Sequence, residues 1–209
     1  MTGLARPRIA PATAGENVSP DVEALFREGR SFNTWQGVPV ADETLRLLYD
    51  LMRMGPTSTN CTPLRIKFVR SPDARRKLVD ALFPTNRAKA EAAPVTAVLG
   101  MDIDFPATLT RLFAHAPAAR ENYLANPKLT RETAFRNSSI QGGYFILAAR
   151  ALGLDCGPMS GFDKAAMDAA FWQGTAVETN FVCNLGYGRR EDLFPRNPRL
   201  DFDEVCEFL

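Results

Sequence analysis

The sequence is short of the residues that build metal sites and disulfide frameworks. Its 209 residues include one histidine, His115, and four cysteines, which stand at positions 61, 156, 183 and 206 with no C-x-x-C spacing. Zinc and iron sites need several histidine or cysteine ligands, so we predict no metal site. Cysteines this far apart in the sequence do not indicate a disulfide framework, and we expect each to be a small buried hydrophobic residue. A reducing compartment fits this pattern, so we expect a cytoplasmic protein.

The chain also lacks an excess of charge of either sign. Its 25 lysines and arginines nearly balance 24 aspartates and glutamates, which gives a formal net charge of +1. We therefore expect no nucleic-acid partner and no membrane-binding face, and no segment approaches the ~20 apolar residues of a membrane span. Residues 1–20, rich in proline and alanine, predict a flexible N-terminal arm, and residues 21–209 predict one domain.

Several catalytic motifs are missing as well. The sequence contains no G-x-S-x-G, no G-x-x-x-x-G-K-[ST] and no H-E-x-x-H. Gly186 and Gly188 follow an apolar run, but Glu191 stands where the dinucleotide fingerprint needs a third glycine, and Pro195 stands in place of the expected helix. A nucleophilic cysteine paired with His115 stays open as an alternative, although an isolated histidine is more often a surface residue.

Hydrophobic periodicity predicts helices that separate a few strands. Apolar residues recur at helical spacing in 22–26, in 45–52 with Asp42 as a candidate cap, and in 167–171, and Ser71 should cap a helix over 72–82. Strands are predicted over 65–70, 94–102 and 179–187. Such an order indicates an α+β or three-layer domain.

The longest predicted helix covers residues 133–152. Ile140, Tyr144, Leu147 and Ala151 share one of its faces, which we expect to lie in the core. The tail after Pro195 reads as extended, with Phe202, Val205 and Phe208 as its packing residues.

Four polar loop segments are the remaining candidates for chemistry. They cover residues 30–35, 55–63, 157–162 and 196–199. Small polar residues also satisfy backbone groups in ordinary turns, so the segments 30–35 and 55–63 have that simpler interpretation too, and a solvated tail is the simpler interpretation of 196–199. The guanidinium groups of Arg196 and Arg199 suit a phosphate, because paired charge-assisted hydrogen bonds grip phosphate oxygens.

These segments resemble the nitroreductase family of FMN-dependent oxidoreductases. The resemblance is carried by P-T-S-T-N-C-T-P at 56–63, by A-A-R-A-L-G-L-D-C-G-P-M-S-G-F at 148–162 and by P-R-L at 198–200. It implies a three-layer fold over residues 21–209, with a central, mostly antiparallel sheet flanked by helices, in an intertwined homodimer with FMN at the interface. The segments T-W-Q at 34–36, G-P-T-S-T-N-C at 55–61, T-A-F-R-N-S-S at 133–139 and N-L-G-Y-G at 184–188 resemble in particular its malonic semialdehyde (3-oxopropanoate) reductase branch of pyrimidine catabolism.

The resemblance implies two sets of flavin contacts in the first half of the chain. Arg30, Ser31 and Asn33 fall on the first flavin-binding cluster, in which Gly29 and Asn33 each replace a basic residue and Arg27 is the alternative to Arg30. In the loop that a second subunit lays against the flavin, the matching residues are Thr57, Ser58 and Asn60, while Thr62 and Leu64 replace the more usual Gln and Trp.

The other implied contacts are distributed over the rest of the sequence. They are Asn86 and Lys89 beside the pyrimidine ring, Asn137 on the long helix, Pro158, Met159, Ser160 and Gly161 along the isoalloxazine edge, and Arg196 and Arg199 at the phosphate.

The implied activity is hydride transfer from NADH or NADPH through flavin N5 to an acceptor, in alternating half-reactions. The branch resemblance favours reduction of 3-oxopropanoate to 3-hydroxypropanoate. A broad-specificity nitro- or quinone reductase and a non-catalytic flavin-binding protein are the alternatives. No side chain need act as a nucleophile; His115 and Tyr144 are candidate proton donors, and Arg136 or Arg120 is a candidate partner for the substrate carboxylate.

Overall fold

The computed structural model describes residues 19–209, so almost all of the predicted N-terminal arm lies outside the described residues. Four strands form one sheet in the order β1-β2-β4-β3, and every neighbouring pair is antiparallel. The strands are β1 Leu64–Val69, β2 Val95–Asp102, β3 Asp155–Met159 and β4 Val177–Gly186. β2 lies at the centre and is buried along nearly its whole length, which explains its continuous apolar sequence.

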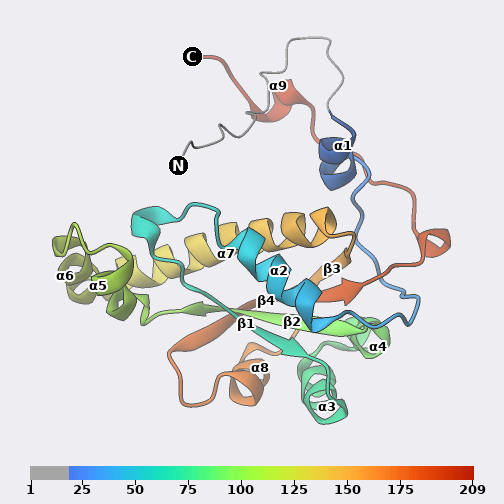
Figure 1. Ribbon diagram of the computed structural model, residues 1–209, viewed down its shortest axis with the longest axis horizontal. Helices are drawn as coiled ribbons and strands as arrows, with labels where there is room; N and C mark the ends of the chain where they lie inside the picture. Colours follow the sequence, from blue (N-terminus) through green and yellow to red (C-terminus); the bar gives the residue numbers. More distant parts are fainter. Residues whose placement is uncertain (1–18) are drawn as a thin grey trace, which may run out of the picture.

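Helices cover both faces of the sheet (Figure 1). One layer holds α2 Asp42–Met52 and α7 Pro127–Ala151, and the opposite layer holds α3 Pro72–Ala81, α4 Pro84–Ala92 and α8 Lys164–Phe171. The short helices α5 Leu109–Leu112 and α6 Ala118–Ala125 lie near the start of α7. At the other end of α7 lie α1 Pro20–Phe26 and the C-terminal tail with α9 Phe202–Val205. The predicted three-layer α+β fold with a mostly antiparallel sheet is confirmed.

Two apolar clusters fill the spaces between the layers. One contains Leu48 and Phe145 against β2 and β4, and the other contains Leu78 and Met167 on the opposite face of the sheet. Each face of the central strands therefore contacts a separate core, and burial of these side chains is the main stabilising term.

The prediction of which face of the long helix lies in the core is wrong. Ile140 is 40% exposed, whereas Asn137, Gln141 and Phe145 are almost completely buried. The helix turns this polar face inward because the two amides are satisfied there. Oδ1 of Asn137 accepts from the backbone N–H of Ser58, and Oε1 of Gln141 accepts from that of Leu64. Hydrogen-bonded amides can be buried at little cost, and a count of apolar residues does not register this.

Strand β3 was not predicted, because Gly157 and Pro158 within it are typical of loops. Pro158 is tolerated because β3 is an edge strand of the four-stranded sheet, where a missing N–H disrupts no interior ladder. Gly157 is required because a Cβ there would lie 2.5 Å from the carbonyl oxygen of Phe32. Asp42 is not a cap either; Ala41 is the N-cap and Asp42 is the first residue of α2.

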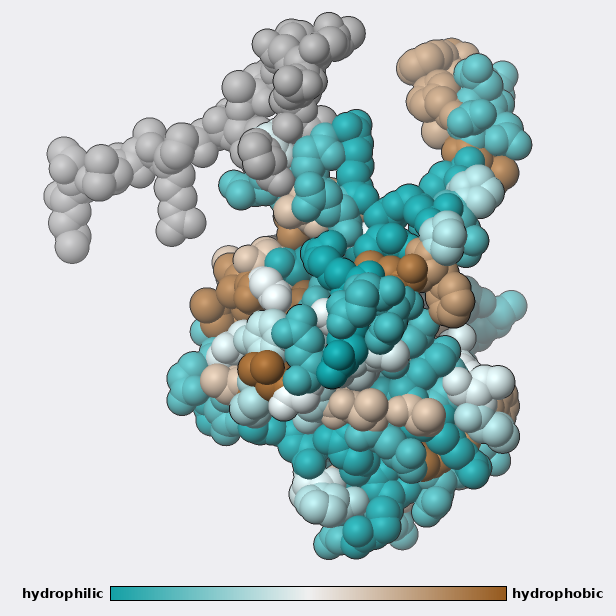
Figure 2. All heavy atoms as spheres, turned by 90° about the vertical axis from the view of Figure 1, so that its right-hand side faces the viewer, coloured by the Kyte–Doolittle hydropathy of each residue, from teal (hydrophilic) through white to brown (hydrophobic). Residues whose placement is uncertain are grey.

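The tail does not pack as predicted. Phe202, Val205 and Phe208 are 53%, 61% and 90% exposed, and only the rings of Phe202 and Phe208 contact each other. Figure 2 shows apolar atoms on a segment that projects from the body of the molecule, whereas most of the surface on this side is hydrophilic. Apart from that contact, residues 19–209 leave these side chains exposed.

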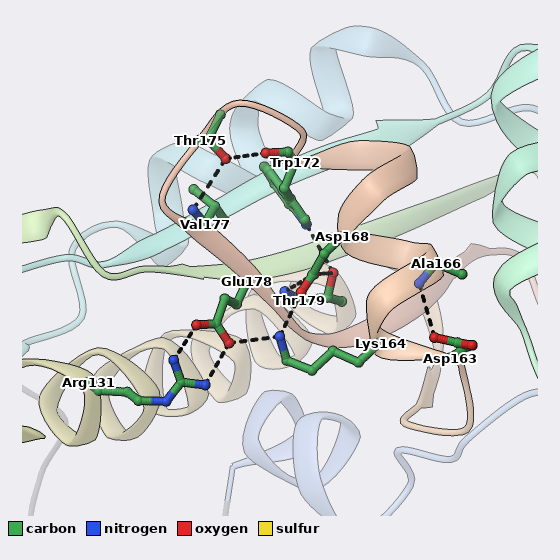
Figure 3. A network of polar contacts seen from close by, with 10 residues as sticks. All are labelled: Arg131, Asp163, Lys164, Ala166, Asp168, Trp172, Thr175, Val177, Glu178 and Thr179. Carbon is green, nitrogen blue, oxygen red and sulfur yellow. Dashed lines mark hydrogen bonds and ion pairs between the residues drawn. The ribbon is translucent and has the colours of Figure 1, made fainter.

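A polar network joins α7, α8 and β4 (Figure 3). Arg131 donates to both carboxylate oxygens of Glu178, and Lys164 Nζ bridges Glu178 and Asp168 at 2.8 and 2.6 Å. Asp168 also accepts from the backbone and hydroxyl of Thr179, at 2.6 Å each. The network therefore ties the start of β4 to both helix layers.

Residues 19–209 include no helix long and apolar enough to cross a membrane. In the same part of the chain, no cluster of three or more histidine, cysteine, aspartate or glutamate side chains is placed to hold a metal ion. All four cysteines have free thiols.

Candidate functional site

A cleft of about 240 Å³ lies where the segment after α1, the end of α7 and the C-terminal tail meet. Five of the predicted binding residues line it, namely Arg30, Ser31, Asn33, Arg196 and Arg199. They come from positions more than 160 residues apart, and the tertiary structure brings them together. Arg27 is not among the lining residues and pairs instead with Glu23 at 2.6 Å, so Arg30 is the arginine that faces the cleft.

The cleft is strongly positive. Four arginines line it, and Asp192 is the one acidic side chain among the lining residues. Within residues 19–209, none of these four arginines forms an ion pair with a carboxylate. A concentration of guanidinium groups without counter-charges attracts an anion with several oxygen atoms.

Backbone carbonyls hold these arginines in place. Arg150 Nη1 donates to the carbonyl of Leu25 at 2.8 Å, and Arg196 Nη2 donates to the carbonyl of Gly29 at 3.0 Å. Arg30 donates to the carbonyl of Phe194 on the tail. The three side chains therefore link the N-terminal segment, α7 and the tail around one cavity.

Arg150 is the one arginine among the lining residues that the sequence interpretation missed. It lies in the last turn of α7, where basic residues are common, so the helical pattern did not indicate a binding role for it. The available signal was the run A-A-R-A at 148–151, in which a single charge interrupts small apolar residues. Only the tertiary structure places that charge beside Gly29 and Arg30.

A second group of predicted residues lies at the end of β3. Nδ2 of Asn86 and the backbone N–H of Phe83 both donate to the carbonyl of Gly161, at 3.0 and 3.1 Å. The buried Asn184 donates to the carbonyl of Lys89 at 3.1 Å and so fixes the C-terminal half of α4 against β4. Pro158 and Ser160 are exposed, and Met159 is half-buried.

This group is continuous with the cleft through β3. The backbone N–H of Phe32 donates to the carbonyl of Cys156 at 2.9 Å, and Ser31 forms a β-bridge with Cys156. The first cluster thus extends the sheet edge that ends at Ser160 and Gly161. Residues from 30–33, 86–89, 158–161 and 196–199 therefore occupy one side of the molecule.

The third group is the loop from Thr57 to Asn60, which lies elsewhere. It contains the 3₁₀ turn η1 Ser58–Asn60, and Thr59, Asn60 and Thr62 have φ values of 50°, 49° and 36°. Positive φ is costly for β-branched residues such as threonine, so tertiary contacts must hold this shape. They include the Ser58–Asn137 hydrogen bond at 2.8 Å, the bond from Asn60 Nδ2 to the carbonyl of Leu112 at 3.0 Å, and that from the Tyr144 hydroxyl to the carbonyl of Pro56 at 3.0 Å.

One copy of the chain does not unite this loop with the positive cleft. Asn137 and Arg150 are thirteen residues apart on α7, which corresponds to about 20 Å along the helix axis. Figure 1 shows the loop before β1 near the first half of α7, while α1 and the C-terminal tail lie toward the other end of the helix. The predicted contacts therefore form two separate surfaces within a single chain.

The candidate substrate contacts do not converge on either surface. His115 is exposed and packs against the ring of Phe113, with ring centroids 4.2 Å apart. Arg136 is exposed on α7, and Arg120 pairs with Glu121 at 2.7 Å. The hydroxyl of Tyr144 is occupied by the carbonyl of Pro56.

The buried thiols are poor nucleophiles. Burial raises the pKa of Cys61 to about 11, and the pKa of Cys183 is raised by its hydrogen bond with Cys156 and by burial. Both groups stay protonated at neutral pH, and only a thiolate attacks efficiently. The alternative of a cysteine–histidine pair gains no support from these two residues.

Comparison with known proteins gives a consistent picture. The model of the nitroreductase family matches residues 30–187. A Caulobacter protein (strain K31) is 51% identical over 185 residues, which cover 88% of this chain and 94% of that protein, and a Burkholderia lata protein is 55% identical over the same shares. Both carry the provisional name NADH dehydrogenase/NAD(P)H nitroreductase, which does not mention 3-oxopropanoate.

Solved structures share the fold at low sequence identity. A nitroreductase of Exiguobacterium sibiricum in complex with FMN has a TM-score of 0.81 at 17% identity, over 93% of this chain and 99% of that one. The Bacillus subtilis protein ydfN has a TM-score of 0.80 at 22% identity, over 90% and 99% of the two chains.

Proposed function

This chain belongs to the nitroreductase family, and from that membership we propose that it is an FMN-dependent oxidoreductase with NADH or NADPH as its hydride donor. The observation that carries the proposal is the cleft lined by four arginines, none of which pairs with a carboxylate in residues 19–209. The names of the relatives support the nucleotide donor, and the FMN bound in a protein of the same fold supports the cofactor.

The cleft residues suit the phosphate of FMN. A phosphate monoester carries close to two negative charges at neutral pH, so it needs cationic donors and small hydrogen-bonding groups. Arg30, Arg196 and Arg199 would supply the charges, and Ser31 and Asn33 would supply further hydrogen bonds. Arg150 is a fourth arginine in the lining, and its Nη2 makes only a long contact of 3.5 Å with the carbonyl of Arg30, so it adds donor capacity to this cavity.

The group at the end of β3 would hold the ring system. Asn86 and Lys89 present polar groups from α4, and Pro158, Met159, Ser160 and Gly161 form the adjoining edge. The chemistry that FMN supplies when bound is reversible acceptance of a hydride. The ammonium group of Lys89 would stabilise negative charge on the pyrimidine side, and the chain's main task is to orient donor and acceptor and to exclude water.

A homodimer completes the site in this proposal. Thr57, Ser58, Asn60 and Asn137 would come from the second copy, because Asn137, which holds this loop, lies about 20 Å along α7 from Arg150 within one chain. The exposed apolar residues Ile140, Phe202 and Phe208 are surfaces that such a partner would cover.

For the acceptor we propose nitroaromatic compounds and quinones with broad specificity. The names of the relatives, which include NAD(P)H nitroreductase, support this, and transfer to such acceptors needs no dedicated nucleophile. The second candidate is 3-oxopropanoate, which the segments at 34–36, 55–61, 133–139 and 184–188 favour. For that substrate His115 would donate a proton and Arg136 would pair with the carboxylate, both in the completed dimer.

Anaerobic spectroscopy of the purified protein tests these assignments. We expect about one FMN to bind per chain and the visible absorbance of the bound flavin to bleach on addition of NADH or NADPH. Reoxidation rates with a nitroaromatic, a quinone and 3-oxopropanoate then rank the acceptors. A clear preference for 3-oxopropanoate would contradict broad nitro- and quinone reduction and would favour the second candidate, 3-oxopropanoate, as the acceptor.

A non-catalytic flavin-binding protein is the remaining alternative. It would bind FMN without being reduced by either nicotinamide nucleotide. Protein that does not bind FMN at all would overturn the proposed function.

A further inference from the structure

Arg150 and Gly29 occupy the same corner of the positive cleft. A Cβ atom added at Gly29 would lie 2.6 Å from both Cζ and Nη1 of Arg150 and 2.9 Å from its Nε. Real Cβ atoms do not approach heavy atoms so closely, so the guanidinium occupies space that any other residue at position 29 would fill. The guanidinium of Arg150 can therefore occupy this position in the cleft because Gly29 has no side chain.

The guanidinium of Arg150 is only partly satisfied by the protein. Nη1 donates to the carbonyl of Leu25 at 2.8 Å, and Nη2 makes a long contact of 3.5 Å with the carbonyl of Arg30. Nε is buried and has no hydrogen-bond partner within residues 19–209. Because Nη2 makes only this long contact and Arg150 lines the cleft, the guanidinium keeps donor capacity for an anionic oxygen.

The position of Arg150 on α7 also matters. It lies in the last turn of a 25-residue helix, where the unpaired carbonyls carry partial negative charge. By itself that helix end would repel an anion. A guanidinium in the last turn reverses the sign of the local potential.

We propose that Arg150 is a phosphate-binding residue of the cleft and that Gly29 is required for its entry. The anion site is thus built from three elements, the segment after α1, the tail and the end of α7. This inference rests on the proposed function, in which the anion is the phosphate of FMN.

Comparison of FMN with riboflavin isolates this role, because the two ligands differ only by the phosphate. In Arg150→Met we expect FMN to bind at least about tenfold more weakly, while riboflavin affinity changes less than about twofold. Arg150→Lys, which keeps the charge but loses Nε and the planar fork, should lie between Arg150→Met and the wild type. Affinities are measured by flavin fluorescence quenching in the full chain.

Gly29→Ala provides an independent test, because it leaves Arg150 in the sequence but removes its space. We expect the same selective loss of FMN affinity. Arg190→Met is the matched control. Arg190 is exposed and is not among the lining residues, so its replacement changes net charge equally and should leave the FMN-to-riboflavin ratio unchanged.

A purely structural role for Arg150 predicts a different result. Loss of the bond to Leu25 would then lower the melting temperature and weaken both flavins alike. An unchanged FMN-to-riboflavin ratio in Arg150→Met and Gly29→Ala would overturn this inference while the wild type still binds FMN. Failure of the wild type to bind FMN would overturn the proposed function itself.

Discussion

The backbone N–H of Ser58 donates to Oδ1 of Asn137 at 2.8 Å, so a buried amide on α7 holds the loop that carries Thr57 and Asn60. Nδ2 of the same amide donates to the carbonyl of Thr133 at 2.9 Å, which fixes its orientation. The loop contains three residues other than glycine with positive φ. Its shape therefore depends on this helix rather than on local preference.

Asn137→Ala should release the loop. We expect a loss of about 1–2 kcal/mol in the free energy of unfolding, because the variant removes the acceptor of a partly buried N–H. Hydrogen exchange over 57–62 should become faster. Glu132→Ala, at an exposed position of the same helix, is the control, and equal exchange in the two variants would contradict the anchoring role.

Gly55→Ala should produce a steric clash between the new methyl group and the ring of Tyr144. A Cβ at position 55 would lie 2.2 Å from Cδ2 of that ring. We expect destabilisation by about 1–3 kcal/mol in urea unfolding, which is typical of overpacking. The same change in a Tyr144→Ala background should cost much less, because the clash is then absent. Additive effects of the two substitutions would show that the ring is not responsible.

Glu178 should contribute stability that depends on pH. Hydrogen bonds from Arg131 and then from Lys164 lower the pKa of Glu178 from 4.5 to about 2. A carboxylate with a lowered pKa stabilises the folded state fully above pH 4.5, and this contribution is lost as the pH falls toward 2.

Glu178→Gln should therefore be less stable than the wild type at pH 7, and the difference should shrink below pH 4.5. We expect about 1 kcal/mol at pH 7, since solvent screens a carboxylate that remains 26% exposed. Glu191→Gln, at an exposed pair with Arg189, is the matched control and should show no such trend. A stability difference independent of pH would contradict the lowered pKa.

Arg199→Ala should weaken FMN binding far more than it lowers stability. Within residues 19–209, its guanidinium donates only to the carbonyls of the nearby tail residues Asn197 and Pro198, and Arg199 is exposed. We expect a change in unfolding free energy below about 0.5 kcal/mol and a loss of FMN affinity of about tenfold or more. Equal FMN affinity would remove Arg199 from the site.

Mixed dimers test whether two chains share one site. Arg199→Ala alters the cleft, and Ser58→Trp places a bulky group on the loop proposed to reach the partner. In a heterodimer of the two variants, one site receives both changes and the other receives none. We expect it to bind up to about half of the wild-type amount of FMN, whereas each variant homodimer binds little. A heterodimer that binds no more than the homodimers would place the whole site in one chain.

Local sequence patterns predicted most of the elements. Alternation in 65–70 and the apolar runs at 94–102 and 179–187 correspond to β1, β2 and β4, and Ser71 caps α3 by accepting from the backbone of Ala74. These features depend on neighbours in sequence, so single-sequence reasoning reaches them. The polar loops with Arg30, Arg196 and Arg199 were recognisable by residue type, because few side chains suit a phosphate.

Residue types and local patterns thus sufficed for the fold class and for the candidate arginines of the cleft. The buried face of α7, the place of Pro158 in an edge strand and the position of Arg150 beside Gly29 depend on how the elements pack. Each of these depends on groups distant in sequence. Asn137 and Gln141 can be buried because loop N–H groups meet them, and Arg150 reaches the cleft because position 29 has no side chain. Such contacts leave no periodic trace in the chain, since hydrogen bonding and steric complementarity are set only when the elements pack.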